Sequence, residues 1–148
     1  MAPLIVLVSS FVLFRLAGLA GISALDETSL PLRIAVASMF LLTASAHWGK
    51  RRADLVRMIP ARIPRPELVV TVTGVLELVG AVGMLVPATA PYAAVGLALL
   101  LGAMFPANVN AARAKLSIGG RPVTPLPQRS AMQLVFLAAV LGAGSIGC

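Results

Sequence analysis

The chain has 148 residues, of which 59% are hydrophobic and only 11% are charged, and its formal net charge is +7. Soluble domains carry roughly 25% charged residues, so this composition excludes an ordinary soluble domain and predicts an integral membrane protein, a single transmembrane domain over residues 1–148. The basic residues lie between apolar segments without interleaved aromatic residues, a pattern that favours cytoplasmic loops over nucleic-acid binding.

Five apolar segments follow one another along the chain and predict an all-α bundle of five transmembrane helices. We expect the first to be a retained helix and not a signal peptide, because no charge precedes Arg15, which lies inside it. Closely spaced prolines exclude one continuous helix in the connection between the second and third segments. The segments span approximately residues 4–24, 32–48, 68–86, 92–110 and 131–147.

The connections differ sharply in charge. Of the twelve Lys and Arg residues, six fall in the second connection and four in the fourth, whereas the first carries Asp26 and Glu27 and the third carries no charge. Basic loops remain in the cytoplasm, so this alternation predicts a multi-pass protein of the inner membrane with its N-terminus inside and its C-terminus outside.

Glu77 lies near the middle of the third segment, where an ionisable group is costly and needs compensation. Small residues at helical offsets of three and four surround it, so we expect the carboxylate to point into the bundle where another helix approaches closely. These neighbours are Thr73, Gly74, Gly80 and Ala81.

Arg15 lies near the middle of the first segment, which predicts that it shares a depth with Glu77. An ion pair would relieve part of the cost of each charge, and we predict an Arg15–Glu77 pair inside the bundle. The pair would serve either a functional site or a packing device that fixes helix register.

His47 is the single histidine and lies toward the cytoplasmic end of the second segment, beside Trp48. Such a histidine either carries protons near neutral pH or anchors the helix end together with the tryptophan. A metal site is not expected, since one His, one terminal Cys and scattered carboxylates give no ligand spacing.

The end of the fourth segment combines Pro106 with Asn108. Proline loosens the helix backbone and the amide both donates and accepts hydrogen bonds, so this end would line a wet pocket, hold a polar ligand head, or form a capped helix end. Together with His47 and Glu77 as candidate catalytic residues, we take Arg15, Trp48, Thr73, Pro106 and Asn108 as candidate ligand-binding residues.

The only cysteine is Cys148, the last residue, which we expect to face outside. Dithiol redox chemistry within the chain is therefore excluded, and no cofactor is expected within the chain apart from a possible quinone.

Four short motifs occur in the order found in DoxX-like membrane proteins of bacteria, and the chain resembles that family over roughly residues 31–112. They are residues 46–48 (AHW), 57–60 (RMIP), 74–83 (GVLELVGAVG) and 105–108 (FPAN). The resemblance implies a four-helix core to which the first segment is added, and it implies roles for His47, Glu77 and Asn108. It also implies a link to thiosulfate or quinone oxidation and to membrane oxidoreductase complexes.

Two functions stay open. The first is an accessory or scaffold subunit that binds a quinone or lipid in a buried polar site and holds a redox partner protein or a second copy of itself in the bilayer. The second is a small intramembrane enzyme in which Glu77 and His47 act as acid and base on a lipophilic substrate. A transporter is less favoured, because five short spans leave little room for alternating access without oligomerisation.

Overall fold

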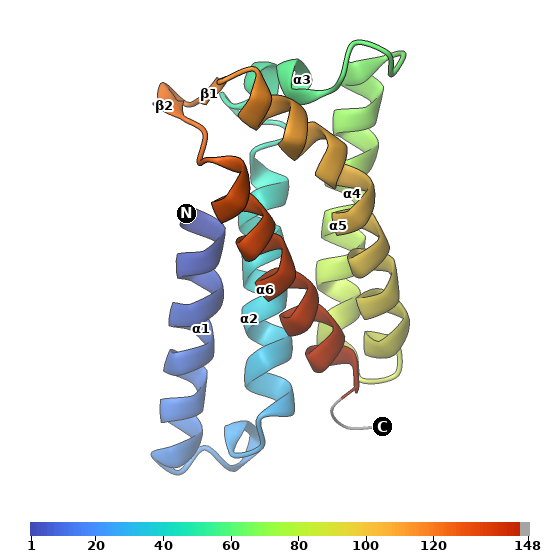
Figure 1. Cartoon of the computed structure of the whole chain (residues 1–148). Coiled ribbons are helices and arrows are strands. Elements are labelled where there is room, and N and C mark those ends of the chain that lie inside the picture. Colours follow the sequence, from blue (N-terminus) through green and yellow to red (C-terminus); the bar gives the residue numbers. More distant parts are fainter. Residues whose placement is uncertain (146–148) are drawn as a thin grey trace.

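The computed structural model describes residues 1–145 and is helical throughout, apart from one short hairpin (Figure 1). The helices are α1 Ala2–Leu19, α2 Ser29–Ser45, α3 Arg52–Met58, α4 Pro66–Leu85, α5 Ala90–Arg113 and α6 Leu126–Ser145, with a 3₁₀ turn, η1, at Ser23–Leu25. The strands are β1 Ser117–Ile118 and β2 Arg121–Pro122. The expected all-α fold class is confirmed for this part of the chain.

Prolines mark several helix boundaries. α1, α4 and α5 each carry a proline at the first or second helical position, where the missing N–H would have no intrahelical partner. In the second connection α3 ends at Met58, just before Pro60. The prolines therefore stop a helix there as expected, but the seven residues of α3 before them were not predicted.

The fourth connection contains a two-residue hairpin that the sequence analysis did not anticipate. Ser117 pairs with Pro122 in antiparallel register, and the loop residues Gly119 and Gly120 have φ values of +59° and +75°. Two consecutive positive φ values suit the tight turns that join antiparallel strands, and glycine adopts them without strain.

Four helices form a closed ring in which α2 packs on α4, α4 on α5, α5 on α6 and α6 back on α2. α1 lies outside this ring against α2 (Figure 1). α2 is consequently covered on most sides and contributes much of the core, including the fully buried Met39 and Phe40.

The buried face of α4 explains why Glu77 points inward. The buried positions recur at spacings of four and three, the pattern of a helix that presents one seam to its neighbours. They are Val70, Gly74, Glu77, Ala81 and Met84. Residues on either side of Glu77, such as Leu76 and Leu78, are exposed.

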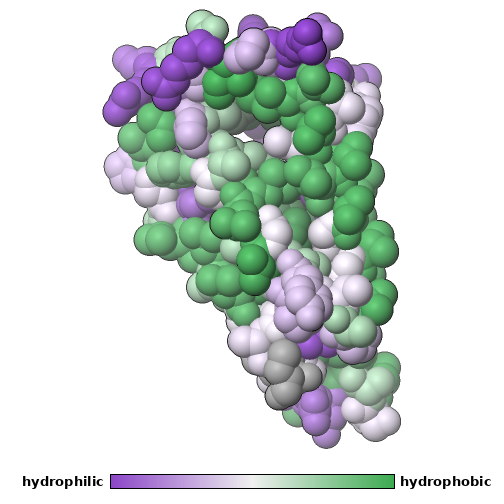
Figure 2. Space-filling view, turned by 90° about the vertical axis from the view of Figure 1, so that its right-hand side faces the viewer, coloured by the Kyte–Doolittle hydropathy of each residue, from purple (hydrophilic) through white to green (hydrophobic). Residues whose placement is uncertain are grey.

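Large hydrophobic side chains cover the outer faces of α1, α4 and α5. Figure 2 looks onto the side where α4 and α5 lie and shows hydrophobic residues over its middle and hydrophilic residues gathered at the end that carries α3. Within the described residues, α1, α4 and α5 are long and apolar enough to cross a membrane, whereas α2 has 17 residues. The surface is thus compatible with a membrane protein.

Several predicted boundaries need correction. α1 ends at Leu19 and not at 24, because the N–H groups of Gly21 and Ile22 bond back to Gly18 and Ala17, with Gly21 at φ +110°. This hydrogen-bond pattern closes a helix at a left-handed glycine. α2 ends at Ser45, which leaves His47 in the following turn.

The last two predicted helices also differ from expectation. α5 continues through Pro106 to Arg113, and α6 already begins at Leu126. The end of the fifth predicted segment and Cys148 lie outside the described residues.

Candidate functional site

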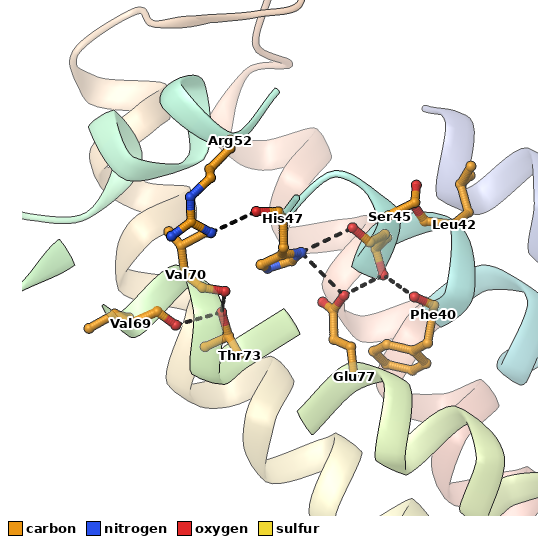
Figure 3. A network of polar contacts seen from close by, with 10 residues as sticks. Phe40, Leu42, Ser45, His47, Arg52, Val69, Val70, Thr73 and Glu77 are labelled. Carbon is orange, nitrogen blue, oxygen red and sulfur yellow. Dashed lines mark hydrogen bonds and ion pairs between the residues drawn. The ribbon is translucent and has the colours of Figure 1, made fainter. Parts of the chain in front are cut away.

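The strongest polar feature of the bundle interior is a cluster that joins α2 to α4 (Figure 3). Glu77 is only 1% exposed and His47 5%, so both are buried, and they point toward one another from the two helices. The prediction that Glu77 faces into the bundle is confirmed. Because an ionisable group in an apolar core must be satisfied by neighbours, the contacts of these two side chains define the site.

The hydroxyl of Thr43 is the direct partner of Glu77. Its Oγ1 lies 2.9 Å from Oε2 of Glu77 and 3.0 Å from the carbonyl oxygen of Phe40. A hydroxyl carries one proton and can donate to only one of two acceptors. Both contacts are hydrogen bonds when Glu77 is the neutral acid, since its O–H then donates to Oγ1 while Thr43 donates to Phe40.

His47 is held by the backbone of the same helix. Its Nδ1 lies 3.1 Å from the carbonyl oxygen of Thr43, and since a carbonyl only accepts, Nδ1 carries the proton. The same nitrogen is 3.8 Å from Oε2 of Glu77, which is beyond a direct hydrogen bond but within electrostatic contact. The neutral ring therefore keeps its lone pair on Nε2.

Nε2 of His47 reaches the molecular surface. Among residues 1–145, no fully buried side-chain nitrogen or oxygen lacks a hydrogen-bond partner. Nε2 makes no hydrogen bond within that part of the chain, so it must be accessible from outside the bundle. The cluster thus has a buried acid on one side and an outward-facing acceptor on the other.

Gly74 makes this arrangement possible. A Cβ at this position would lie 2.7 Å from Cβ of His47 and 2.9 Å from Cη2 of Trp48, so only glycine lets both rings rest on α4. The Trp48 side chain is 47% exposed, and its ring centroid is 6.1 Å from that of His47. Trp48 therefore flanks the surface next to the imidazole.

Arg52, in the first turn of α3, fixes the turn that carries His47 (Figure 3). Its Nη1 donates to the carbonyl oxygen of His47 at 2.8 Å, and its Nη2 donates to Oγ1 of Thr71 at 2.9 Å. One guanidinium thus ties the end of α2 to the first half of α4. This long-range role left no signal in the sequence.

The predicted Arg15–Glu77 ion pair is wrong. Nη1 of Arg15 donates to the carbonyl oxygens of Asp26 at 2.6 Å and Leu25 at 3.3 Å. Arg15 is four residues from the end of α1, so its long side chain reaches the end of the helix, and α1 packs on α2 outside the ring that contains α4. Arg15 accordingly closes the α1–α2 turn and takes no part in the cluster.

The other candidate residues lie elsewhere. Oγ1 of Thr73 bonds back to the carbonyl oxygens of Val69 and Val70 within α4. Oδ1 of Asn108 accepts from Nη1 of Arg129 at 2.6 Å and so ties α5 to α6. No hydrogen bond or ion pair in residues 1–145 joins Asn108 to His47 or Glu77. Of the candidates, only His47, Glu77 and Trp48 come together.

Pro106 lines a separate cavity on α5.

Arg33 is a second buried charged residue, which was not predicted from the sequence, although it lies inside the second apolar segment. Its Nε donates to the carbonyl oxygen of Ala143 at 3.1 Å, near the end of α6, where helix carbonyls lack intrahelical partners. Arg33 therefore joins α2 to α6 away from the cluster.

The chemistry available to the cluster is hydrogen bonding and proton transfer. An imidazole whose Nε2 takes up a proton can release the proton on Nδ1 to an ionised Glu77, and in the neutral ring the outward Nε2 can accept a hydrogen bond from a ligand. Within residues 1–145, no three His, Cys, Asp or Glu side chains are grouped so as to hold a metal ion.

Comparison with known proteins identifies a family. A family model described as a domain of unknown function (DUF8561) matches residues 36–143. The matched range runs from within α2 to within α6, so it contains the whole cluster and leaves α1 outside. No curated protein and no solved structure matches the chain.

Proposed function

The chain belongs to the DUF8561 family, and we propose that it is a five-span inner-membrane protein that acts as an accessory or scaffold subunit of an oxidoreductase system and binds a quinol or lipid head at the cluster. The observation that carries this proposal is the cluster of Thr43, His47 and Glu77, buried between two helices of the bundle. Intramembrane ionisable residues mark functional sites by default.

The membrane orientation rests on charge and contact. The two basic connections meet at one end of the bundle, where the N–H of Gly119 donates to Oδ2 of Asp54 at 2.8 Å. Ten of the twelve basic residues lie in these connections, so this end faces the cytoplasm by the positive-inside rule, with the N-terminus inside and the C-terminus outside. α2 and α6 then complete the five spans together with α1, α4 and α5.

The oxidoreductase association rests on the resemblance to DoxX-like proteins. Two of the motif residues, His47 and Glu77, lie in one cluster, although they belong to motifs about thirty residues apart. A core of four ring helices with α1 added outside agrees with the four-helix core that the resemblance implies.

The tautomer of His47 specifies the kind of ligand. Because Nδ1–H is engaged with the carbonyl of Thr43, Nε2 accepts and the ligand must donate. A quinol hydroxyl or a lipid alcohol fits this requirement better than a quinone carbonyl. The half-exposed ring of Trp48 offers an apolar face for the ligand ring beside the imidazole.

A second candidate is an intramembrane enzyme. Oε2 of Glu77 and Nδ1 of His47 are 3.8 Å apart, and a ligand donating to Nε2 would pass its proton to the imidazole while Nδ1 releases its own proton to an ionised Glu77. In this reading, the two groups act on a lipophilic alcohol that enters between the helices.

The test is to purify the full chain in a mild detergent and quantify co-purifying quinones, lipids and partner proteins by mass spectrometry. We compare wild type with His47→Phe, which keeps a ring in place but removes Nε2, and with Thr73→Val, whose hydroxyl bonds only within α4. A quinol that is lost in His47→Phe and kept in Thr73→Val supports the accessory subunit.

Two results decide between the candidates or overturn both. A lipid that the purified protein alters chemically, with turnover abolished in Glu77→Gln, favours the enzyme. If His47→Phe folds and retains the same quinone, lipid and partner content as wild type, the cluster is a packing device and the proposed binding role is wrong.

A further inference from the structure

A cavity of about 470 Å³ lies at the basic end of α5, apart from the cluster. One wall comes from the proline-rich connection that precedes α4, and the other comes from the last turns of α5. The lining residues are Pro60, Ala61, Arg62, Phe105, Pro106, Val109, Asn110 and Arg113. Figure 2 shows a hollow just below the hydrophilic end of the face on which α4 and α5 lie.

The charge of this cavity is unbalanced. Arg62 and Arg113 line it from opposite walls and both are exposed, and neither guanidinium group makes a hydrogen bond or ion pair within residues 1–145. None of the described residues that line the cavity is acidic. The neighbouring Arg57, by contrast, is paired with Asp54. Two free guanidiniums facing one space favour an anion that accepts several hydrogen bonds, such as a phosphate group.

The rest of the lining is apolar. Phe105, Pro106 and Val109 form a wall below the two arginines, and the amide nitrogen of Asn110 is already bonded to the carbonyl oxygen of Met58 at 2.9 Å. A small inorganic anion has no apolar surface to bury against this wall. A phosphate that is attached to a hydrocarbon chain gains binding free energy by burying the chain there.

Phe105 also lines a second cavity of about 310 Å³ between α5 and α6. That cavity is almost wholly apolar and is lined further by Gly102, Ser130, Gln133, Leu134 and Leu137. The two cavities therefore adjoin at Phe105, and the second one lies along α5 and α6.

We propose that the cavity between Arg62 and Arg113 binds the phosphate headgroup of an anionic phospholipid, whose acyl chain passes Phe105 into the second cavity. Basic pockets between transmembrane helices at the cytoplasmic side recognise anionic lipid heads. This inference rests on the membrane placement in the proposed function, but it concerns a different site from the Thr43–His47–Glu77 cluster.

The experiment measures lipid binding to the full chain in neutral detergent by native mass spectrometry. The probes are dioctanoyl phosphatidylglycerol and dioctanoyl phosphatidylcholine. Each arginine near a lipid head contributes about fivefold in affinity, so Arg62→Gln/Arg113→Gln is expected to weaken phosphatidylglycerol binding by about 10- to 30-fold. The charge-matched control Arg51→Gln/Arg121→Gln removes two exposed arginines of the same end that do not line the cavity and should change binding less than about threefold.

Each other outcome overturns the inference. Equal binding of the two lipids by wild type shows that the headgroup charge is not recognised. Equal loss in the control variant shows only a diffuse basic surface. If inorganic phosphate at matched concentration displaces phosphatidylglycerol completely, the site binds free phosphate. Failure of the chain to enter membranes at all would instead refute the proposed function, and carbonate extraction from cell membranes detects that separately.

Discussion

At the residue scale, the bundle is organised by a few polar side chains that each make a hydrogen bond to another helix. Thr43 joins Glu77 to α2, Arg52 joins the turn after α2 to α4, and Arg33 joins α2 to α6. Each removes the cost of a buried polar group and at the same time fixes one helix against its neighbour. Specific hydrogen bonds therefore set the register of an interface that apolar packing alone would leave less defined.

The Thr43–Glu77 contact can be tested by Thr43→Val, which keeps the side-chain shape and removes the hydroxyl. Oε2 of Glu77 then loses its partner at 2.9 Å on the other helix. We expect the free energy of unfolding in micelles to fall by about 1 kcal/mol, the usual scale for interhelical hydrogen bonds in membranes. The control Thr73→Val should change it by less than about 0.5 kcal/mol, since that hydroxyl bonds only within α4. Equal losses in the two variants would contradict a specific role for Thr43.

Gly74 gives a second test of the cluster. In Gly74→Ala the new Cβ would approach Cβ and Cγ of His47 to 2.7 and 2.8 Å, so the turn after α2 must move away from α4. Overpacking of this kind costs about 1–3 kcal/mol. In Gly96→Ala, where nothing lies within 4 Å of the added Cβ, stability should stay the same or rise by up to about 1 kcal/mol. Thermal unfolding in detergent measures both, and a stable Gly74→Ala variant would contradict the close packing.

The burial of Glu77 could be predicted from sequence because small residues surround it at helical offsets of three and four. Its partner could not be predicted in the same way. Arg15 and Glu77 each lie near the middle of an apolar segment, but α1 ends at Leu19 and packs outside the ring. A shared depth in the membrane does not identify which helices are in contact. Thr43 is uncharged, so the sequence gives no sign that it pairs with a buried carboxylate.

At the scale of elements, the docking of α3 on the hairpin holds the two basic connections together. Asp54 accepts from the N–H of Gly119 and pairs with Arg57. The hairpin could have been predicted from the Gly119-Gly120 pair, whose residues adopt the two positive φ values that such a turn requires. The contact between the hairpin and α3 joins Asp54 and Gly119, which are 65 positions apart, so no local sequence pattern predicts it.

This docking should depend on pH. The hydrogen bond from Gly119, together with Arg57, holds the pKa of Asp54 below its ordinary value of 3.8. A lowered folded-state pKa stabilises the folded form above the ordinary pKa, and this contribution is lost as the pH falls through the lowered value. The hairpin should therefore stay docked at neutral pH and loosen only in acid below about pH 4.

The amide chemical shift of Gly119, followed by NMR in micelles from neutral pH into acid, measures this loosening. Asp54→Asn should abolish the titration. The control Glu27→Gln, an exposed carboxylate in the α1–α2 turn, should leave it unchanged. An unaltered Gly119 titration in Asp54→Asn would show that another group controls the docking.

At the scale of the whole molecule, hydropathy was enough to find all five long helices, but not how they pack. The apolar segments are separated by charged or proline-containing turns, which fixes their number and approximate ends. The closed ring of α2, α4, α5 and α6, and the place of α1 outside it, depend on which small-residue faces meet. Gly80 accommodates Leu97 of α5, and Gly144 lies against Ala94, contacts that join segments far apart in the sequence.

The proposed topology of five spans makes a prediction about sidedness. In a background in which the single cysteine is removed by Cys148→Ser, we expect Ser117→Cys in the hairpin to resist a membrane-impermeant maleimide added to intact spheroplasts and to react only after lysis. Ala88→Cys, in the uncharged turn between α4 and α5, should react from outside without lysis.

Both positions are exposed, so a difference in labelling between them reports the side of the membrane and not burial within the protein. This difference is expected if α4 crosses the membrane, as its 20 residues and apolar character allow, and if the basic end lies in the cytoplasm. Labelling of Ser117→Cys from outside would reverse the orientation, and labelling of both positions before lysis would show that α4 does not span the bilayer.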